Sequence, residues 1–152
     1  EGVKILCQLV HARATKWGGG VARRFARRHP EAERCFSNAI TSVAAGERLG
    51  RVFFAELGDA VQLASIIAQE GYGPSLFPRI RYNALRAGLA QVASKAAAEK
   101  ASVHMPRIGS GAAGGEWGII EEFVESEFVS EGVSVTVYDL PPRREQFELF
   151  GE

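Results

Sequence analysis

The sequence predicts an α/β fold: a three-layer α/β/α sandwich with a mixed, mostly parallel sheet. Short apolar, β-branched runs alternate along the 152 residues with longer segments of helical spacing. The first run, VKILCQLV at residues 3–10, carries no charge after Lys4, as is typical of a strand buried on both faces. Two glycine-rich stretches, KWGGGV and GSGAAGG, each follow such a run and precede a helical segment. We therefore expect both at the edge of the sheet where parallel strands end.

The remaining elements follow in chain order. Residues 21–47 have helical spacing that Pro30 interrupts, which predicts two helices, the second beginning at Pro30. Runs 50–59 and 61–70 predict two strands with a hairpin-like turn at Gly58-Asp59, and a loop, GYGPSLFP, follows them. Beyond the loop the pattern predicts a helix over 79–100, a strand over 102–109, a helix over 117–130 and a last strand over 133–140. These elements form one domain, residues 1–140, with an extended tail at 141–152.

The composition argues against several function classes. Lysine plus arginine and aspartate plus glutamate number 18 each, so no overall field favours nucleic acid or an anionic membrane. Basic residues cluster only in RRFARRH at 23–29, which we interpret as an exposed helix face. No apolar run approaches the roughly 20 residues that span a bilayer, and we recognise no signal peptide, so no membrane contact is expected. The two cysteines fit no disulfide framework, so we expect a reducing, cytoplasmic location. We also expect a monomer.

The two cysteines do not suggest a disulfide framework or a metal site. Cys7 lies in the first apolar run and Cys35 in a helical segment, and neither has the spacing of zinc ligands. We expect Cys7 to pack as a small hydrophobic residue. No metal is expected.

The glycine-rich stretches have the properties of phosphate-binding loops. GSGAAGG at 109–115 offers backbone N–H groups and little side chain, and a helix begins directly behind it, which favours an anion. Gly109, Gly111 and Gly114 have the G-x-G-x-x-G spacing, but the loop follows the fourth strand rather than the first, so a Rossmann site is not expected. The alternative is that both loops are tight turns needed only for packing.

Several motifs resemble those of one family. VHMPRIGSGAAGGEW at 103–117 is similar to the second phosphate loop of macrodomains, the ADP-ribose-binding or Appr-1-p-processing family. WGGGVARRF at 17–25 resembles their first loop, and VTVYDL at 135–140 their final strand. IIAQ at 66–69 and RYNALRAGLAQV at 81–92 make the resemblance closest to the subgroup of the chromatin-remodeller macrodomain and the terminal ADP-ribose protein glycohydrolase. It extends over residues 3–140.

The resemblance implies a site for ADP-ribose, free or attached to protein or nucleic acid, with no further cofactor. One loop would wrap the diphosphate and distal ribose, the other would donate N–H groups to the diphosphate, and the last strand would face the adenine. The residues so implied are Trp17, Gly18, Gly19, Gly20, Val21, Gln69, Gly109, Ser110, Gly111, Ala112, Ala113, Gly114, Tyr138 and Leu140. Trp17 is either a lid over the distal ribose or a packing anchor, and we interpret Arg107 as structural.

The resemblance leaves catalysis open. The lysine and aspartate used by glycohydrolases of the subgroup fall at Gln69 and Ala113, and the asparagine of other hydrolytic macrodomains falls at Ala12. His11, at the end of the first strand, remains a candidate general base, with a hydrogen-bonded spacer as the alternative. Members of the family also have a further strand upstream, followed by an acidic residue that recognises the adenine amino group. Either a preceding segment is missing here, or adenine is recognised differently. The leading hypothesis is an ADP-ribose binding module, and the alternative is a hydrolase that removes ADP-ribose from protein or DNA.

The tail suggests a partner. QFELF at 146–150 resembles the peptide by which bacterial polymerases and repair proteins dock on the sliding clamp, with Gln146, Leu149 and Phe150 as the anchors. A bacterial protein with a role in DNA repair would fit this interpretation. The alternative is a tail that folds back on its own domain.

Overall fold

The computed structural model describes residues 2–18 and 21–139. Within these residues, five strands and four α-helices follow one another in the order expected of an α/β domain. The elements are β1 (Lys4–His11), α1 (Val21–Arg28), α2 (Pro30–Thr41), a 3₁₀ turn η1 (Ala45–Glu47), β2 (Val52–Gly58), β3 (Val61–Gln69), α3 (Tyr82–Glu99), β4 (Ser102–Pro106), α4 (Trp117–Val124), a π-helical turn η2 (Glu125–Val129) and β5 (Val135–Tyr138).

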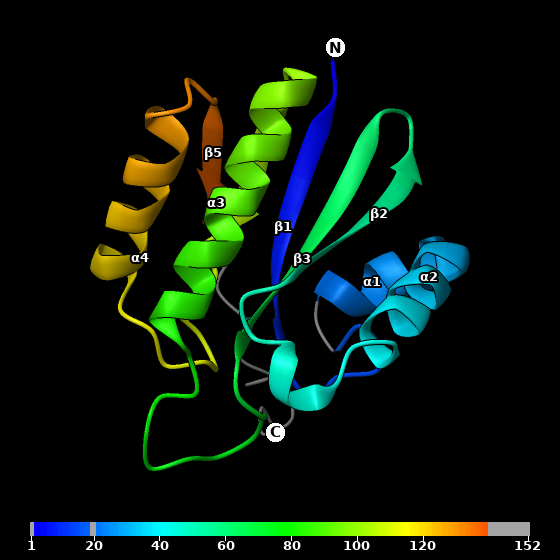
Figure 1. Cartoon of the computed structure of the whole chain (residues 1–152), viewed down its shortest axis with the longest axis vertical. Helices are drawn as coiled ribbons and strands as arrows, with labels where there is room; N and C mark the ends of the chain where they lie inside the picture. The colour runs from blue at the N-terminus through cyan, green and yellow to red at the C-terminus, as the bar shows by residue number, and fades with distance from the viewer. Residues whose placement is uncertain (1, 19–20, 140–152) are drawn as a thin grey trace, which may run out of the picture.

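The strands form one sheet in the order β2-β3-β1-β4-β5. β1 is parallel to β3 and β4, β4 is parallel to β5, and only β2 is antiparallel to its neighbour. The mixed, mostly parallel sheet lies between α1 and α2 on one side and α3 and α4 on the other (Figure 1). The predicted three-layer α/β/α sandwich is confirmed.

Each face of the sheet has its own core, because side chains alternate along β1. Ile5 and Cys7 point toward α3 and α4, where they pack with residues such as Leu89 and Phe128. Leu6 and Val10 point to the other face and pack with α1 and α2. Cys7 is 4% exposed, so it does pack as a small hydrophobic residue. The close approach of α3 to β3 requires Gly88, since a Cβ there would lie 2.4 Å from Cγ2 of Ile66.

Several predicted boundaries are wrong by a few residues. The helix expected over 79–100 begins at Tyr82, and Ile80 instead forms a β-bridge with Gln69. The strand expected over 102–109 ends at Pro106, and the helix expected over 117–130 becomes a π-helical turn after Val124. The late start of α3 has a tertiary cause, because backbone hydrogen bonds from residues 79–81 to Ala113 and Ala68 hold residues 79–81 extended.

The parallel register brings four strand ends to one edge of the sheet. β1, β3, β4 and β5 end at His11, Gln69, Pro106 and Tyr138, and their parallel pairing places these ends at the same edge of the sheet; β1 and β5 run downward in Figure 1. Both glycine-rich loops therefore start from the same edge, as predicted.

Candidate functional site

The second glycine-rich loop closes on itself through short backbone hydrogen bonds. The N–H of Gly115 donates to the carbonyl of Gly109 (2.7 Å), and the N–H of Gly114 donates to that of Gly111 (3.0 Å). Gly109 and Gly114 have φ of 78° and 76°, which favour glycine. At Gly115 a Cβ would lie 2.5 Å from the carbonyl oxygen of Gly109. Three of the glycines are thus explained by the geometry of the loop itself.

The same loop is fixed to the segment between β3 and α3. The carbonyl of Ala113 accepts hydrogen bonds from the N–H groups of Arg79 (2.9 Å) and Ile80 (3.0 Å), and Ala113 is buried. The N–H of Glu116 donates to the Tyr82 hydroxyl (3.0 Å) just before α4 begins. The loop is therefore held from both sides and is pre-formed.

Gly111 is the glycine that the loop's own packing does not require. It is exposed, its φ is not left-handed, and a Cβ built on it meets no atom within 4 Å. Within the described residues, the N–H groups of Gly111, Ala112 and Ala113 have no hydrogen-bond partner. Three consecutive unpartnered amides beside the N-terminus of α4 are suited to an anion.

Of the five amides that the resemblance implies as diphosphate donors, two are used within the loop. Gly114 donates to Gly111, and Ser110 donates to the carbonyl of Arg107 at 3.3 Å. The hydroxyl of Ser110 also bonds to that carbonyl (2.6 Å). The N–H groups of the exposed Gly111 and Ala112 and of the buried Ala113 remain without a partner among the described residues.

The first glycine-rich loop is anchored by Trp17. This side chain is 5% exposed and packs on Phe36, with ring centroids 5.9 Å apart, as a packing anchor would; its buried Nε1 has no hydrogen-bond partner within the described residues. The backbone N–H of Trp17 donates to the Glu33 carboxylate (3.2 Å). Next to it Gly18 is exposed, and a Cβ there would meet nothing within 4 Å.

The other residues expected in this loop can be placed only in part. Gly19 and Gly20 lie outside the described residues, and Val21 is the first residue of α1. A pocket of about 440 Å³ opens beside the described part of the loop, lined by Trp17, Gly18, Arg23, Ala26, Arg27 and Glu33.

His11 lies at the end of β1, opposite Gln69 in the sheet register. Its ring lies 5.0 Å from that of Tyr72, and its buried Nδ1 has no hydrogen-bond partner in the described part of the chain. Burial, and secondarily the Arg13 charge, lower the pKa of His11, so the imidazole is neutral at pH 7. A neutral ring with an unused nitrogen meets the protonation requirement of a general base. The Nε2 of Gln69 donates a hydrogen bond to the carbonyl of Gly71 (2.9 Å) in the loop that follows β3.

Tyr138 lies at the end of β5 and faces the α1 side of the sheet. Its hydroxyl is 2.9 Å from Nδ1 of His104, and the two rings stack with centroids 5.9 Å apart. His104 Nε2 lies 2.8 Å from the Ser102 hydroxyl, which fixes the imidazole from the other side. Tyr138 also lines an apolar pocket of about 220 Å³, together with Phe25 of α1. Leu140, expected beside it, lies outside the described residues.

Sequence reasoning missed Phe25 and His104 as neighbours of this pocket. Phe25 looks like one apolar position of a basic helix, and His104 like a mid-strand residue. Only the parallel pairing of β4 with β5 brings His104 and Tyr138 together.

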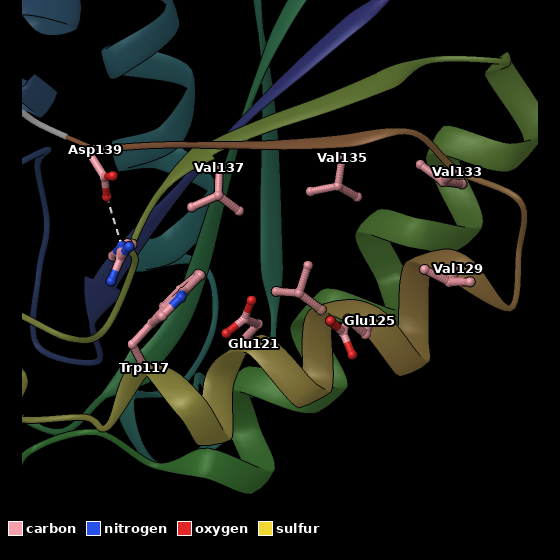
Figure 2. A pocket seen from close by; sticks show the side chains of 10 residues that line it. Trp117, Glu121, Glu125, Val129, Val133, Val135, Val137 and Asp139 are labelled. Atoms are coloured by element: carbon pink, nitrogen blue, oxygen red, sulfur yellow. Dashed lines mark ion pairs between the residues drawn. The ribbon is translucent and has the colours of Figure 1, made fainter.

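A separate groove of about 320 Å³ lies on the other face, between α4 and β5. Figure 2 shows Val135 and Val137 pointing from β5 toward Trp117 and Glu121. Arg107 spans its end, with an ion pair to Asp139 (2.7 Å) and its guanidinium 5.7 Å from the Trp117 ring centroid, which supports the structural interpretation of Arg107. The groove contains no residue of either glycine-rich loop, and its lining carboxylates would repel a diphosphate.

Among residues 2–18 and 21–139, no cluster of three histidine, cysteine or acidic side chains could hold a metal ion. No helix in this part of the protein has the length and apolarity needed to cross a membrane.

Comparison with known proteins identifies the family. No family model matches the chain. A macrodomain protein from Streptomyces coelicolor is 32% identical, with 93% of this chain and 90% of that chain covered and a TM-score of 0.75. This chain is a macrodomain. The family resemblance predicted from the sequence is confirmed.

Other relatives extend the comparison. A Bacteroides thetaiotaomicron protein of unknown function is 35% identical over 92% of this macrodomain and 89% of its own chain, with a TM-score of 0.81. The chromodomain-helicase-DNA-binding protein 1-like of Danio rerio is 34% identical over 76 residues, which are 50% of this chain and 7% of that protein. This macrodomain therefore spans only a small part of that relative. A structure of Thermosipho africanus DarTG in complex with ADP-ribose shares the fold at 16% identity and a TM-score of 0.71.

Proposed function

We propose that this macrodomain binds ADP-ribose at the edge where its two glycine-rich loops lie. The observation that carries the proposal is the row of unpartnered amides at Gly111, Ala112 and Ala113, with open space where a side chain at position 111 would stand. Nothing inside the described chain uses these donors, and a diphosphate would accept hydrogen bonds from them.

Two further features support a nucleotide diphosphate. The N-terminus of α4 lies directly behind the loop and favours negative charge. The apolar pocket between Phe25 and Tyr138 offers aromatic surface on the same edge, of the kind that covers a purine. A protein of the same fold, Thermosipho africanus DarTG, has been solved in complex with ADP-ribose.

Isothermal titration calorimetry with ADP-ribose tests this function. We expect saturable heat with a dissociation constant well below 1 mM, and no heat with ribose alone. Absence of heat at 1 mM ADP-ribose would reject the proposal.

A second candidate is hydrolysis, in which His11 would act as the base that activates water. It is favoured by the neutral imidazole and the unused Nδ1 on the same edge of the sheet. Purified protein would be incubated with ADP-ribosylated protein and with ADP-ribosylated DNA, and released ADP-ribose measured. Release that is lost in His11→Ala but kept in Gln69→Ala would establish the enzyme; no release from either substrate would leave a binding module.

A further inference from the structure

Charge is segregated in this macrodomain, although its net charge is zero. Residues 11–29 hold six lysine or arginine residues and no acid, whereas residues 116–131 hold six glutamates and no base. The first group lies on and around α1 and the second on α4 and η2, on opposite faces of the sheet (Figure 1). We name the first group the basic strip: Arg13, Lys16, Arg23, Arg24, Arg27 and Arg28.

The charges of the basic strip face solvent. Along α1, Ala22, Phe25 and Ala26 pack against the second core, and the arginines occupy the opposite side of the helix. Within the described residues, none of the strip's cations takes part in an ion pair, because the five salt bridges found there involve other residues. Among the described residues, no carboxylate neutralises these charges.

The loop between β3 and α3, residues 70–81, exposes large apolar side chains. Tyr72 is 72% exposed, Leu76 97% and Phe77 78%. Exposed apolar side chains grouped in this way are typical of a binding surface. We name residues 70–81 the rim loop.

The rim loop is braced from within. The Arg79 guanidinium donates to the carbonyls of Glu70 (3.2 Å), Gly73 (3.0 Å) and Pro74 (3.1 Å). Arg81 pairs with the Glu70 carboxylate and fixes the base of the loop. Because these bonds hold the backbone of the rim loop, little backbone freedom is left to lose on binding.

The basic strip and the rim loop are continuous. Arg13 lines the same pocket, of about 420 Å³, as Tyr72 and Phe77. Trp17 lies four residues after Arg13. Trp17 and Gly18 line a second pocket together with Arg23 and Arg27 of the basic strip. The basic strip therefore meets the rim loop at Arg13, which lies beside two exposed aromatic rings.

We propose that the basic strip and the rim loop bind single-stranded nucleic acid. Arginines would contact the phosphates, and Tyr72 and Phe77 would stack on unpaired bases, as in single-strand binding surfaces. An acidic peptide would meet the same cations, but it has no flat base to stack on exposed rings. The proposal concerns unmodified nucleic acid, so it goes beyond ADP-ribose binding and does not depend on it.

The test is fluorescence anisotropy with a labelled, unmodified 20-nucleotide single strand, titrated at several salt concentrations. Arg24→Ala with Arg28→Ala removes two cations that lie outside the pocket of the first glycine-rich loop. We expect weaker binding and a salt slope smaller by about 1.4, since each single-strand phosphate contact contributes about 0.7. Lys100→Gln, which removes a cation at the far end of α3, is the matched control and should leave affinity within twofold.

Aromatic stacking is tested separately. Tyr72→Ala with Phe77→Ala should weaken binding by about 30-fold or more without changing the salt slope, because two stacking rings are removed and each contributes at least about 1 kcal/mol. Leu76→Ala is the control, since Leu76 is more exposed than either ring but cannot stack on a base. Calorimetry with ADP-ribose on the arginine variant should show unchanged affinity.

Three results would overturn the proposal. They are no binding of the oligonucleotide at 100 μM protein in low salt, an equal loss in Lys100→Gln, and equal binding of a polyglutamate peptide at the same salt concentration. The last would assign the surface to an acidic protein.

Discussion

Replacing Gly111 by glutamate is the most direct perturbation of the proposed phosphate site. The position is exposed, its backbone is not left-handed, and a new Cβ meets no atom within 4 Å. The folded protein should therefore accept the side chain with little loss of stability, within about 0.5 kcal/mol for a surface site. A loss of binding would then report on the ligand and not on the fold.

The expected loss is set by electrostatics. A carboxylate about 6 Å from one phosphate charge, at an effective dielectric constant of about 20, costs roughly 2.8 kcal/mol. That is about a 100-fold loss of affinity, before any steric block of the amides at Ala112 and Ala113. Gly111→Ala adds a methyl group without charge, so its loss should be much smaller.

Calorimetry with ADP-ribose gives the affinities, and a thermal melt gives the stability of each variant. We expect Gly111→Glu to melt close to the wild type and to show no heat at ligand concentrations that saturate the wild type. Unchanged affinity in a folded Gly111→Glu protein would refute our placement of the diphosphate.

Four further outcomes are expected. Gly115→Ala should lower the free energy of unfolding by about 1–3 kcal/mol, because its Cβ would lie 2.5 Å from the carbonyl oxygen of Gly109; urea unfolding measures this, and wild-type stability would contradict the clash. Burial raises the pKa of the Cys7 thiol to about 12, so a thiol reagent at pH 8 should label only the exposed Cys35 until urea is added; two fast-reacting native thiols would contradict this. Burial is the main cause that lowers the pKa of both His11 and His104 below the ordinary 6.5, so the unfolded chain takes up protons first as the pH falls. The stability that they contribute is complete above pH 6.5 and is lost as the pH falls toward the folded pKa. Between pH 7.5 and pH 5.5 the free energy of unfolding should therefore fall less in a variant with both histidines changed to glutamine than in the wild type. A labelled peptide of residues 141–152 should bind a bacterial sliding clamp in the micromolar range and lose that binding on Leu149→Ala with Phe150→Ala; no binding of the unsubstituted peptide would reject the clamp hypothesis.

Features that depend on neighbouring residues were predictable from the sequence. The uncharged run at 3–10 marks a buried strand, Pro30 marks the start of α2, and the glycine-rich stretches mark loops between a strand and a helix. Parallel strands then bring both loops to one edge, which follows from element order alone.

The individual roles of the loop residues were less predictable. Gly109, Gly111, Gly114 and Gly115 look alike in the sequence, yet three are required by positive φ or by contacts within the loop and Gly111 is not. The sequence allows Trp17 as a lid or as a packing anchor, and only the structure shows that its ring packs on Phe36. Ile80 fits the apolar face of the following helix, but hydrogen bonds to Ala113 hold it in an extended segment.

By itself, then, the sequence determined the α/β class, the order of the elements and the edge on which the glycine-rich loops lie. These depend on periodicity and turn chemistry, which act over a few residues. Only the tertiary structure decided which amides remain unpartnered, how His104 holds Tyr138, and that Arg13 reaches the rim loop. These features depend on residues that lie on different strands or loops. Strand order and register decide which of those residues meet, and both result from the packing of the whole chain.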